Sequence, residues 1–334
     1  MIHVQNFAAG YLGMSQTIMH KVSILGGSGF VGQHLVTNLS RRGVSCRVLS
    51  RHPQRHAHLK ILPGVQLVQC PSLGIPELIE GFEGSDTVIN LIGILNESGK
   101  SSFRQMHVEL VDRIVEAAIK ARAGRLLHMS ALHADAARGS SEYLRSKGEG
   151  ENRAHTHGGT TLKVTSFRPS VIFGDGDSFF NRFGGLLRSA PGVFPLACPD
   201  SRFAPVWVED VAEAFARCLD NTATVGGHYD LCGPTAYSLR ELVAYTAATL
   251  GLRRHILPLG KGLSRLQAIL LGHIPGRPFT LDNYLSLQTD SVCERNGLAE
   301  LGIQARSIEA VVPRYLARKH HHGHLDRLRR QRLP

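Results

Sequence analysis

A run of glycines directly after the first apolar segment limits most strongly what this chain can fold into. Lys21–Leu25 has the pattern of a short strand and leads into Gly26-Gly-Ser-Gly-Phe-Val-Gly32, after which apolar residues recur at helical spacing until Gly43. The run therefore lies in a tight turn between a strand and a helix.

Three glycines of this turn stand where a dinucleotide would need them. Gly26 permits the sharp turn, Gly29 lets backbone N–H groups approach a pyrophosphate, and Gly32 lets the helix pack on the sheet. The alternative is an ordinary glycine turn. Because the run follows the first strand and heads an amphipathic helix, we expect dinucleotide binding, with cofactor contacts from Gly26, Gly27, Ser28, Gly29, Phe30, Val31 and Gly32.

Strands and helices continue to alternate through the first half of the chain. Further strands are expected over 44–49, 65–68, 86–93, 125–129 and 162–167, and helices over 103–123 and 141–156. The segment 86–93 is almost wholly apolar, as a parallel strand buried on both faces should be. The predicted fold class is α/β, a doubly wound parallel sheet (Rossmann fold) with a smaller C-terminal α/β lobe for the substrate.

The pattern loosens after Gly174, where stretches with Gly and Pro separate helices expected over 210–219 and 239–250. We assign residues 21–174 to an NAD(P)-binding domain, with later strands returning from about 205–232, and residues 175–316 mainly to the substrate lobe. Asp210, which heads a helix, is expected to be its N-cap. Residues 1–20 are expected to be disordered or a mis-assigned start. Residues 317–334 form a basic tail rich in His and Arg, either solvated or in contact with an anionic lipid or an acidic partner.

Cysteine usage and hydropathy bear on the compartment. The six cysteines stand at wide, irregular spacings without a CxxC pair, so we expect reduced thiols in a reducing compartment. The sequence shows no signal-peptide pattern and no run of the ~20 apolar residues that span a bilayer. We therefore expect a cytoplasmic protein without a transmembrane segment, either free or peripheral at the cytoplasmic face of a membrane.

The net charge of +11 favours an anionic partner. Nucleotide phosphates, an acidic membrane surface, an acidic protein and nucleic acid all satisfy this condition. No nucleic-acid-binding motif is present and the basic residues are not interleaved with aromatic ones, so we do not expect nucleic acid as a partner.

The end of the second strand bears on the choice of cofactor. An NAD enzyme usually presents a carboxylate to the adenosine ribose there, but this chain has Ser50 and Arg51 instead. Ser50 can hydrogen-bond a 2′-phosphate, and Arg51 together with Arg55 can offer it guanidinium groups. We therefore favour NADP(H) and keep NAD(H) as the alternative. Another interpretation of these arginines is a solvated basic turn.

A Tyr-x-x-x-Lys pair, Tyr143 and Lys147, lies in the helix expected over 141–156 and places both side chains on one face. With this pair the chain resembles the extended short-chain dehydrogenase/reductases of the NAD-dependent epimerase/dehydratase superfamily. More narrowly, it resembles their atypical branch, which contains subunit nine of the alpha subcomplex of respiratory complex I and its bacterial relatives. The resemblance runs from about Lys21 to about Tyr315 and is carried by His128–Ala134, Ser141–Glu151, Phe167–Gly174, Phe179–Phe183, Pro205–Val211 and Tyr229–Pro234.

The resemblance implies roles for these residues. Tyr143 would be the general acid/base facing the nicotinamide, and Lys147 would hold the nicotinamide ribose and lower the pKa of the tyrosine. Ser130 is either a displaced hydroxyl partner of this pair or simply the serine at the end of the strand. Further cofactor contacts are expected from Leu91, Ile92, Gly93, Pro169 and Val171.

Departures from the family pattern qualify these roles. Catalytic members carry a serine or threonine about two residues beyond Ser130, where this chain has Leu132. The asparagine typical of the preceding long helix is replaced by His107, and the acidic residue that often follows the third strand is missing around Cys70. Such an incomplete tetrad makes cofactor binding a firmer expectation than turnover.

Two functions remain open. The first is an NADP-dependent oxidoreductase or sugar-nucleotide-type epimerase acting on a small or quinone-related substrate. The second is a protein without turnover that holds NADPH as a structural or redox-sensing element beside a membrane or respiratory complex. The 18 histidines include His155-x-His157 and a cluster at 320–324, but no second ligand set follows at a fixed spacing, so we expect no metal.

Overall fold

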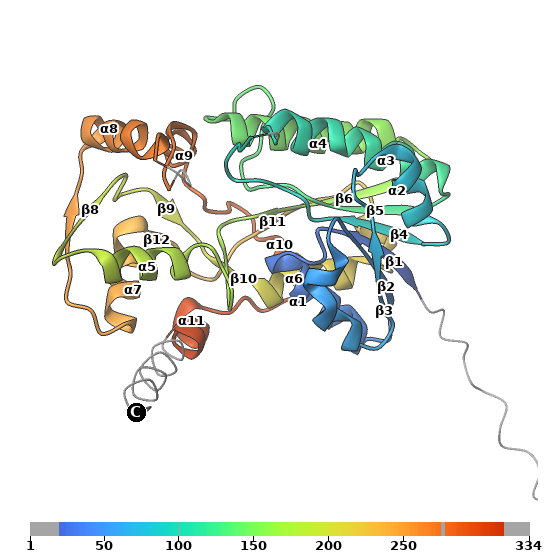
Figure 1. Ribbon diagram of the computed structural model, residues 1–334, viewed down its shortest axis with the longest axis horizontal. Helices are drawn as coiled ribbons and strands as arrows, with labels where there is room; N and C mark the ends of the chain where they lie inside the picture. Colours follow the sequence, from blue (N-terminus) through green and yellow to red (C-terminus); the bar gives the residue numbers. More distant parts are fainter. Residues whose placement is uncertain (1–19, 100, 275–277, 317–334) are drawn as a thin grey trace, which may run out of the picture.

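The computed structural model describes residues 20–99, 101–274 and 278–316. The expectations for residues 1–19 and for the basic tail lie outside this range. A central sheet of seven parallel strands has the order β11-β6-β5-β4-β1-β2-β3 (Figure 1). Its strands are β1 (Lys21–Leu25), β2 (Ser45–Ser50), β3 (Val65–Gln69), β4 (Thr87–Asn90), β5 (Arg125–Met129), β6 (Lys163–Pro169) and β11 (His228–Leu231).

Helices cover both faces of the sheet, in agreement with the predicted doubly wound fold. One face packs against α1 (Phe30–Arg41) and α6 (Val208–Cys218), and the other against α2 (Ile75–Phe82), α3 (Leu110–Lys120) and α4 (Glu142–Gly158) (Figure 1). The central strands β4 and β5 are buried at every position. Strands covered on both faces are expected to be largely apolar. Buried polar side chains of these two strands form hydrogen bonds: Asn90 pairs with His128, and Arg125 donates to Thr165 and Thr224.

The order of the strands reverses beside β1. The chain runs outward through β1, β2 and β3 on one side and through β4, β5, β6 and β11 on the other. At such a reversal the loops after neighbouring strands part to opposite faces, which leaves a ligand-binding crevice at the carboxyl ends. The turns after β1 and β4 meet at this place.

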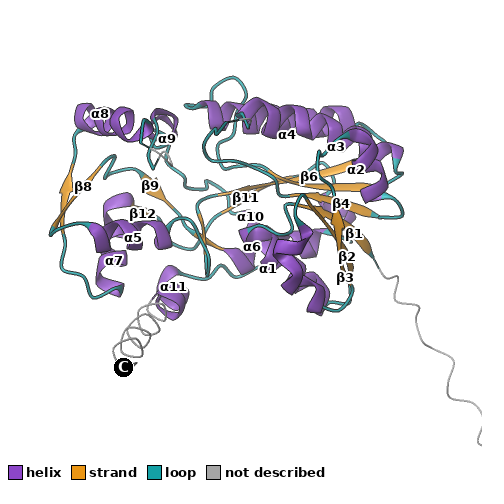
Figure 2. Cartoon of the chain, in the orientation of Figure 1, coloured by secondary structure: helices purple, strands orange, loops and turns teal. Residues whose placement is uncertain are grey.

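A smaller lobe lies beside the sheet and is built from helices and short two-stranded sheets (Figure 2). Its core holds Phe173, Phe180, Leu242 and Val312. The pairs of strands are β7 (Ile172–Phe173) with β10 (Val206–Trp207), β8 (Val193–Leu196) with β13 (His255–Pro258), and β9 (Arg202–Phe203) with β12 (Tyr237–Ser238). The helices are α5 (Phe180–Ser189), α7 (Leu239–Thr249), α8 (Lys261–Gly272), α9 (Leu281–Ser286) and α11 (Ile308–Leu316), and α10 (Gly297–Glu300) returns to β11.

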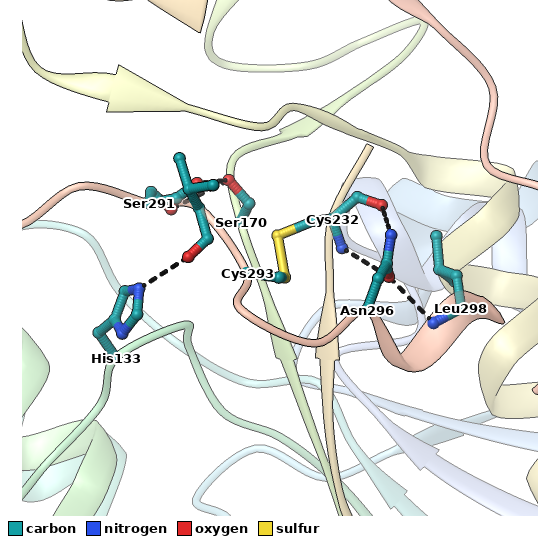
Figure 3. Close-up of a disulfide and its surroundings, with 8 residues drawn as sticks. His133, Ser170, Cys232, Ser291, Cys293, Asn296 and Leu298 are labelled. Atoms are coloured by element: carbon teal, nitrogen blue, oxygen red, sulfur yellow. Dashed lines mark hydrogen bonds between the residues drawn. A yellow bond between two sulfur atoms is a disulfide. The ribbon is translucent and has the colours of Figure 1, made fainter. Parts of the chain in front are cut away.

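A disulfide joins the two parts of the fold. Cys232, directly after β11, is bonded to Cys293 in the segment before α10 (Figure 3). Asn296 braces the bridge, since its side-chain amide donates to the Cys232 carbonyl and its oxygen accepts from the Leu298 backbone N–H (Figure 3). The expectation that all six cysteines are reduced thiols is therefore wrong for this pair. The fold brings these two cysteines together, and their spacing along the chain gives no sign of it.

Two expected helical features also differ. The helix expected over 103–123 begins as a π-helix, Arg104–Glu109, and becomes α3 only at Leu110. Asp210 is not an N-cap, because α6 begins two residues earlier and Trp207 occupies the cap. The Asp210 carboxylate instead accepts a hydrogen bond from the backbone N–H of Arg306.

The π-helix lies against α4 at a point where α4 has no side chain. A Cβ added at Gly150 would lie 1.8 Å from the carbonyl oxygen of His107. The wider π-turn and the glycine together let the two backbones approach closely. This contact sets the distance between α4 and the π-helix.

We predict that Gly150→Ala lowers the free energy of unfolding by about 1–3 kcal/mol, because the added methyl group forces these backbones apart. Gly185→Ala is the matched control, since Gly185 is a helical glycine of α5 with nothing within 4 Å of the added Cβ. The control should raise stability by about 0.5–1 kcal/mol. Urea unfolding of both variants checks the prediction, and equal effects would contradict it.

Candidate functional site

The glycine turn after β1 has the geometry that a bound pyrophosphate needs. Gly26 has a φ of +76°, in the left-handed region. A Cβ at Gly32 would lie 2.2 Å from the carbonyl oxygen of Gly26, so only glycine lets α1 come this close to the turn. The Gly29 N–H donates to the Gly26 carbonyl and closes the turn.

The N-terminus of α1 opens out of this turn. Gly29 is the N-cap, no side chain caps the helix, and no acidic residue lies in the first turn. The N–H groups of Phe30 and Val31 belong to that first turn, whose amides have no carbonyl partner within the helix. Together with the helix dipole they favour an anionic group, so the residues present fit a pyrophosphate.

The end of β2 lies beside the turn and carries the residues predicted to select the cofactor. Ser50 is buried and its hydroxyl accepts a hydrogen bond from the His52 backbone N–H. Arg51 and Arg55 are exposed just beyond it. The first acidic residue of the whole sequence is Glu77, so no carboxylate from this region can meet a ribose 2′-hydroxyl.

The segment after β4 forms the next part of the site. The strand ends at Asn90, earlier than expected, and residues 91–93 leave the sheet. A Cβ on Gly26 would lie 3.1 Å from the carbonyl carbon of Leu91 and 3.2 Å from the nitrogen of Ile92, so the two turns are in contact. One on Gly93 would lie 3.4 Å from Lys147 Nζ. Leu91, Ile92 and Gly93 thus connect the glycine turn to α4.

The first two turns of α4 hold the Tyr-x-x-x-Lys pair. The Ser141 hydroxyl caps the helix by accepting from the Leu144 backbone N–H. The Asp282 carboxylate of α9 also accepts from the backbone N–H groups of Glu142 and Tyr143, at 2.7 and 3.3 Å. The smaller lobe therefore holds the same helix end that carries Tyr143.

Tyr143 and Lys147 are held by different neighbours. The partly buried Tyr143 ring packs edge-on against the rings of His107 and Phe103, with centroids 5.7 and 6.0 Å apart. The buried Lys147 ammonium donates to the Met129 carbonyl at 2.7 Å. The pair thus lies between the π-helix and the end of β5.

Burial shifts the pKa values of both residues of the pair. Burial and the negative charge of Asp282 raise the pKa of Tyr143 to about 12. Burial lowers the pKa of Lys147 to about 8, against the opposing effect of Glu151. With this pKa the tyrosine is a neutral phenol at pH 7 that can donate a proton, and the role of Lys147 in lowering the pKa of Tyr143 stays a prediction.

Ser130 and Leu132 lie in the turn after β5. The Ser130 hydroxyl is buried and has no partner within hydrogen-bonding distance among the described residues. It lies near Glu151 and helps to lower the pKa of that carboxyl group. Leu132 is buried against Ala204 and the disulfide cysteine Cys232. An apolar side chain thus stands where catalytic relatives are expected to have a hydroxyl.

The end of β6 lies next to this turn. The Pro169 carbonyl accepts from the Leu132 backbone N–H, and the Val171 carbonyl accepts from the Val206 backbone N–H. Pro169 and Val171 are both only partly buried at the carboxyl end of the sheet. The structure therefore brings the candidate residues Ser130, Tyr143, Lys147 and Pro169 to the same edge as the glycine turn.

His107 is a neutral part of this site. Its Nε2 accepts from the Ile94 backbone N–H at 3.0 Å, and its Nδ1 lies 2.9 Å from the Ser146 hydroxyl. Burial and the nearby charge of Lys147 lower its pKa to about 2. His107 therefore orients the 91–94 segment without carrying a charge at neutral pH.

A buried ion cluster behind Lys147 is not apparent from sequence motifs. Glu151 accepts from Arg168 of β6 on both carboxylate oxygens, and His228 of β11 contacts it through Nδ1. Burial would raise the pKa of Glu151, but these contacts lower it to about 2. The one available signal is spacing, since Glu151 lies one helical turn after Lys147.

The same cluster is the group of described residues that could hold a metal ion. Ligand atoms of Glu151, His155 and His228 all lie within 4.8 Å of one another. Arg168 already contacts both carboxylate oxygens, so a divalent cation would have to enter beside a guanidinium. The prediction that the chain holds no metal stays a prediction.

We predict that Glu151→Gln lowers the free energy of unfolding by about 3–5 kcal/mol at pH 7, because it leaves Arg168 without its buried counter-charge. The pKa of Glu151 is about 2 in the fold against an ordinary 4.5. The wild type is therefore more stable than Glu151→Gln by the full amount above pH ~5, and this difference in the free energy of unfolding is lost as the pH falls towards 2.

The control is Glu116→Gln, which removes an exposed ion pair with Lys120 and should cost less than about 1 kcal/mol. Denaturant unfolding between pH 3 and 7 provides the measurement. A difference between wild type and Glu151→Gln that does not depend on pH would contradict the assignment.

Known proteins resemble this chain over most of its length. It is 27% identical over 226 residues to the mitochondrial NADH-ubiquinone oxidoreductase 40 kDa subunit of Neurospora crassa, covering 67% of this chain and 58% of that protein. It is 27% identical over 296 residues to mitochondrial NADH dehydrogenase (ubiquinone) 1 alpha subcomplex subunit 9 of Rattus norvegicus, covering 86% and 77%. A ceramide reductase of Caulobacter vibrioides is 31% identical over 200 residues, covering 59% and 61%.

Solved structures share the fold. The NADPH-dependent quinone oxidoreductase of Escherichia coli, complexed with NADPH, superposes with a TM-score of 0.69 at 18% identity, covering 86% of this chain and 96% of that one. The model of the NAD dependent epimerase/dehydratase family matches residues 22–232, which include the glycine turn, the Tyr-x-x-x-Lys pair and β11. The chain belongs to the NAD dependent epimerase/dehydratase family.

Proposed function

We propose that this protein binds NADP(H) at the turn between β1 and α1 and acts as an oxidoreductase in the direction of reduction. The observation that carries the proposal is the uncapped N-terminus of α1 above a glycine turn that no larger residue could form. The site residues that we propose for the pyrophosphate are Gly26, Gly27, Ser28, Gly29, Phe30, Val31 and Gly32.

The preference for NADP(H) over NAD(H) rests on charge. Arg51 and Arg55 are exposed beside the buried Ser50, and the chain has no acidic residue before Glu77. A 2′-phosphate would gain a guanidinium and a hydroxyl here, whereas a 2′-hydroxyl would find no carboxylate to accept its proton.

The chemistry assigned to the chain itself is proton donation. A bound nicotinamide supplies the hydride. Lys147, whose ammonium already donates to a backbone carbonyl, is placed to hold the ribose, and Gly93 leaves room beside it. Tyr143, with a pKa raised to about 12, keeps its proton at neutral pH and can donate it to a carbonyl oxygen. This state suits reduction better than epimerisation, which would begin with the tyrosine as a base.

A second function is favoured by Leu132. Its side chain fills the place expected for the hydroxyl that assists the tyrosine, and the nearby Ser130 hydroxyl is buried close to Glu151. The protein would then hold NADPH without turnover. The likeness to complex I subunits supports a place for such a protein beside a respiratory complex.

We expect the substrate of an active enzyme to be quinone-related, and the location to be the cytoplasm or the cytoplasmic face of a membrane.

Mass spectrometry of the cofactor released from purified protein tests binding and cofactor identity together.

We predict that Arg51→Ala weakens NADPH binding by about tenfold to a hundredfold, as expected for loss of a charge-assisted hydrogen bond, and leaves NADH binding unchanged. Arg41→Ala, at the far end of α1, is the matched control and should change neither. Calorimetric titration with both cofactors measures the effect, and an equal loss for NADH and NADPH would refute the assignment of Arg51.

We predict that Tyr143→Phe retains NADPH binding but lowers NADPH-dependent reduction of a water-soluble quinone by a factor of about 10²–10⁴, because the proton donor is lost. Tyr245→Phe, in the core of the smaller lobe, is the control. Unchanged turnover in Tyr143→Phe would rule out the proposed donor. A wild type that binds NADPH, melts at a higher temperature with it and shows no turnover would favour the second function.

A further inference from the structure

Helix α8 turns its large apolar side chains towards solvent and small side chains towards the protein. The two buried residues of this helix are small, since Ser264 and Ala268 are 1% and 0% exposed. Its large apolar side chains point outward instead, and Leu263 and Leu270 are 58% and 60% exposed. We define the outward face of α8 as Leu263, Leu266, Ile269 and Leu270, with the exposed Ile274 just beyond the helix.

This orientation is fixed by hydrogen bonds and is not open to rotation. The Ser264 hydroxyl donates to the Leu259 carbonyl and accepts from the Cys198 backbone N–H. A turn of α8 that buried its leucines would break both bonds and bring bulky side chains into a space filled by serine and alanine. The apolar face is therefore a surface feature of the native fold.

The charged residues of α8 and of the stretch of sequence around it are all of one sign. Lys261 and Arg265 lie on the helix and are exposed, and Arg253 and Arg254 lie in the preceding segment. The sequence has no acidic residue between Glu241 and Asp282. Cations beside an outward apolar stripe form the pattern of helices that lie in the interface of an anionic membrane.

The position of α8 connects this surface to the candidate active site. Helix α8 lies at the outer edge of the smaller lobe beside α9 (Figure 1). Helix α9 in turn carries Asp282, which binds the N-terminal end of α4 at Tyr143. The exposed Leu95 lies next to α9, because its carbonyl accepts from the Asn283 side chain.

We propose that the outward face of α8 docks on the surface of an anionic lipid bilayer, with its leucines in the acyl boundary and Lys261 and Arg265 at the headgroups. None of the helices in the described part of the chain has the length and hydropathy of a membrane span. The inference does not depend on the proposed cofactor, and it adds the surface by which the protein would reach a lipid-phase substrate.

The same observations argue against a second copy of this chain as the occupant. Two copies meeting through this face would bring two sets of cations together, with no acidic residue from this stretch to compensate them. An anionic bilayer supplies both the apolar medium and the opposite charge.

Co-sedimentation of the full chain with vesicles tests the proposal, using phosphatidylcholine with and without phosphatidylglycerol. The variant Leu263→Gln/Leu266→Gln/Leu270→Gln should bind the anionic vesicles at least about tenfold more weakly than wild type. The variant Lys261→Gln/Arg265→Gln should lose part of the preference for anionic over neutral vesicles. Residues 317–334 are the same in every variant, so the differences report on α8.

Leu186→Gln is the matched control, because Leu186 is a helical leucine of α5 that is 40% exposed and lies outside this face. It should bind vesicles as the wild type does, and every variant should bind NADPH unchanged without vesicles. Wild type that does not sediment with anionic vesicles, or a triple variant that sediments equally well, would overturn the proposal. So would a dimer that the triple substitution dissociates without changing vesicle binding.

Discussion

The buried ion pair between Glu151 and Arg168 holds the rest of the site in place. It ties the middle of α4 to β6, and His228 extends the contact to β11. A buried carboxylate that lost these partners would pay a large desolvation penalty, so α4 cannot slide by a residue along the sheet. Lys147 and Tyr143 lie one and two turns earlier on the same helix, and their positions follow from this register.

The two ends of the candidate site are organised by different parts of the chain. The glycine turn and the N-terminus of α1 belong to the sheet and depend on close backbone contacts at Gly26 and Gly32. The tyrosine end depends on the smaller lobe, because Asp282 accepts hydrogen bonds from the first backbone N–H groups of α4 and adds to the rise that burial causes in the pKa of Tyr143. A ligand that moves α9 would therefore change the acidity of Tyr143 without touching it.

The sequence predicts the doubly wound fold and the glycine turn between β1 and α1 correctly, because their signals are local. A strand, three glycines and an amphipathic helix lie within a short stretch, and Tyr143 and Lys147 show their relation by helical spacing alone. Contacts between distant residues leave no such signal: Glu151 and His228 are 77 residues apart, and Asp282 is 140 residues from Glu142. The π-helix at His107 likewise depends on a tertiary contact with Gly150, which an apolar pattern does not reveal.

The disulfide also changes the connectivity of the smaller lobe. Cys232 and Cys293 are separated by 61 residues, so β12, α7, β13, α8 and α9 lie on a covalently closed ring attached to the end of β11. Closing a loop of this length removes about 4 kcal/mol of entropy from the unfolded chain in the loop-closure description. A protease that cuts once inside the ring would leave the two fragments joined until a reductant separates them.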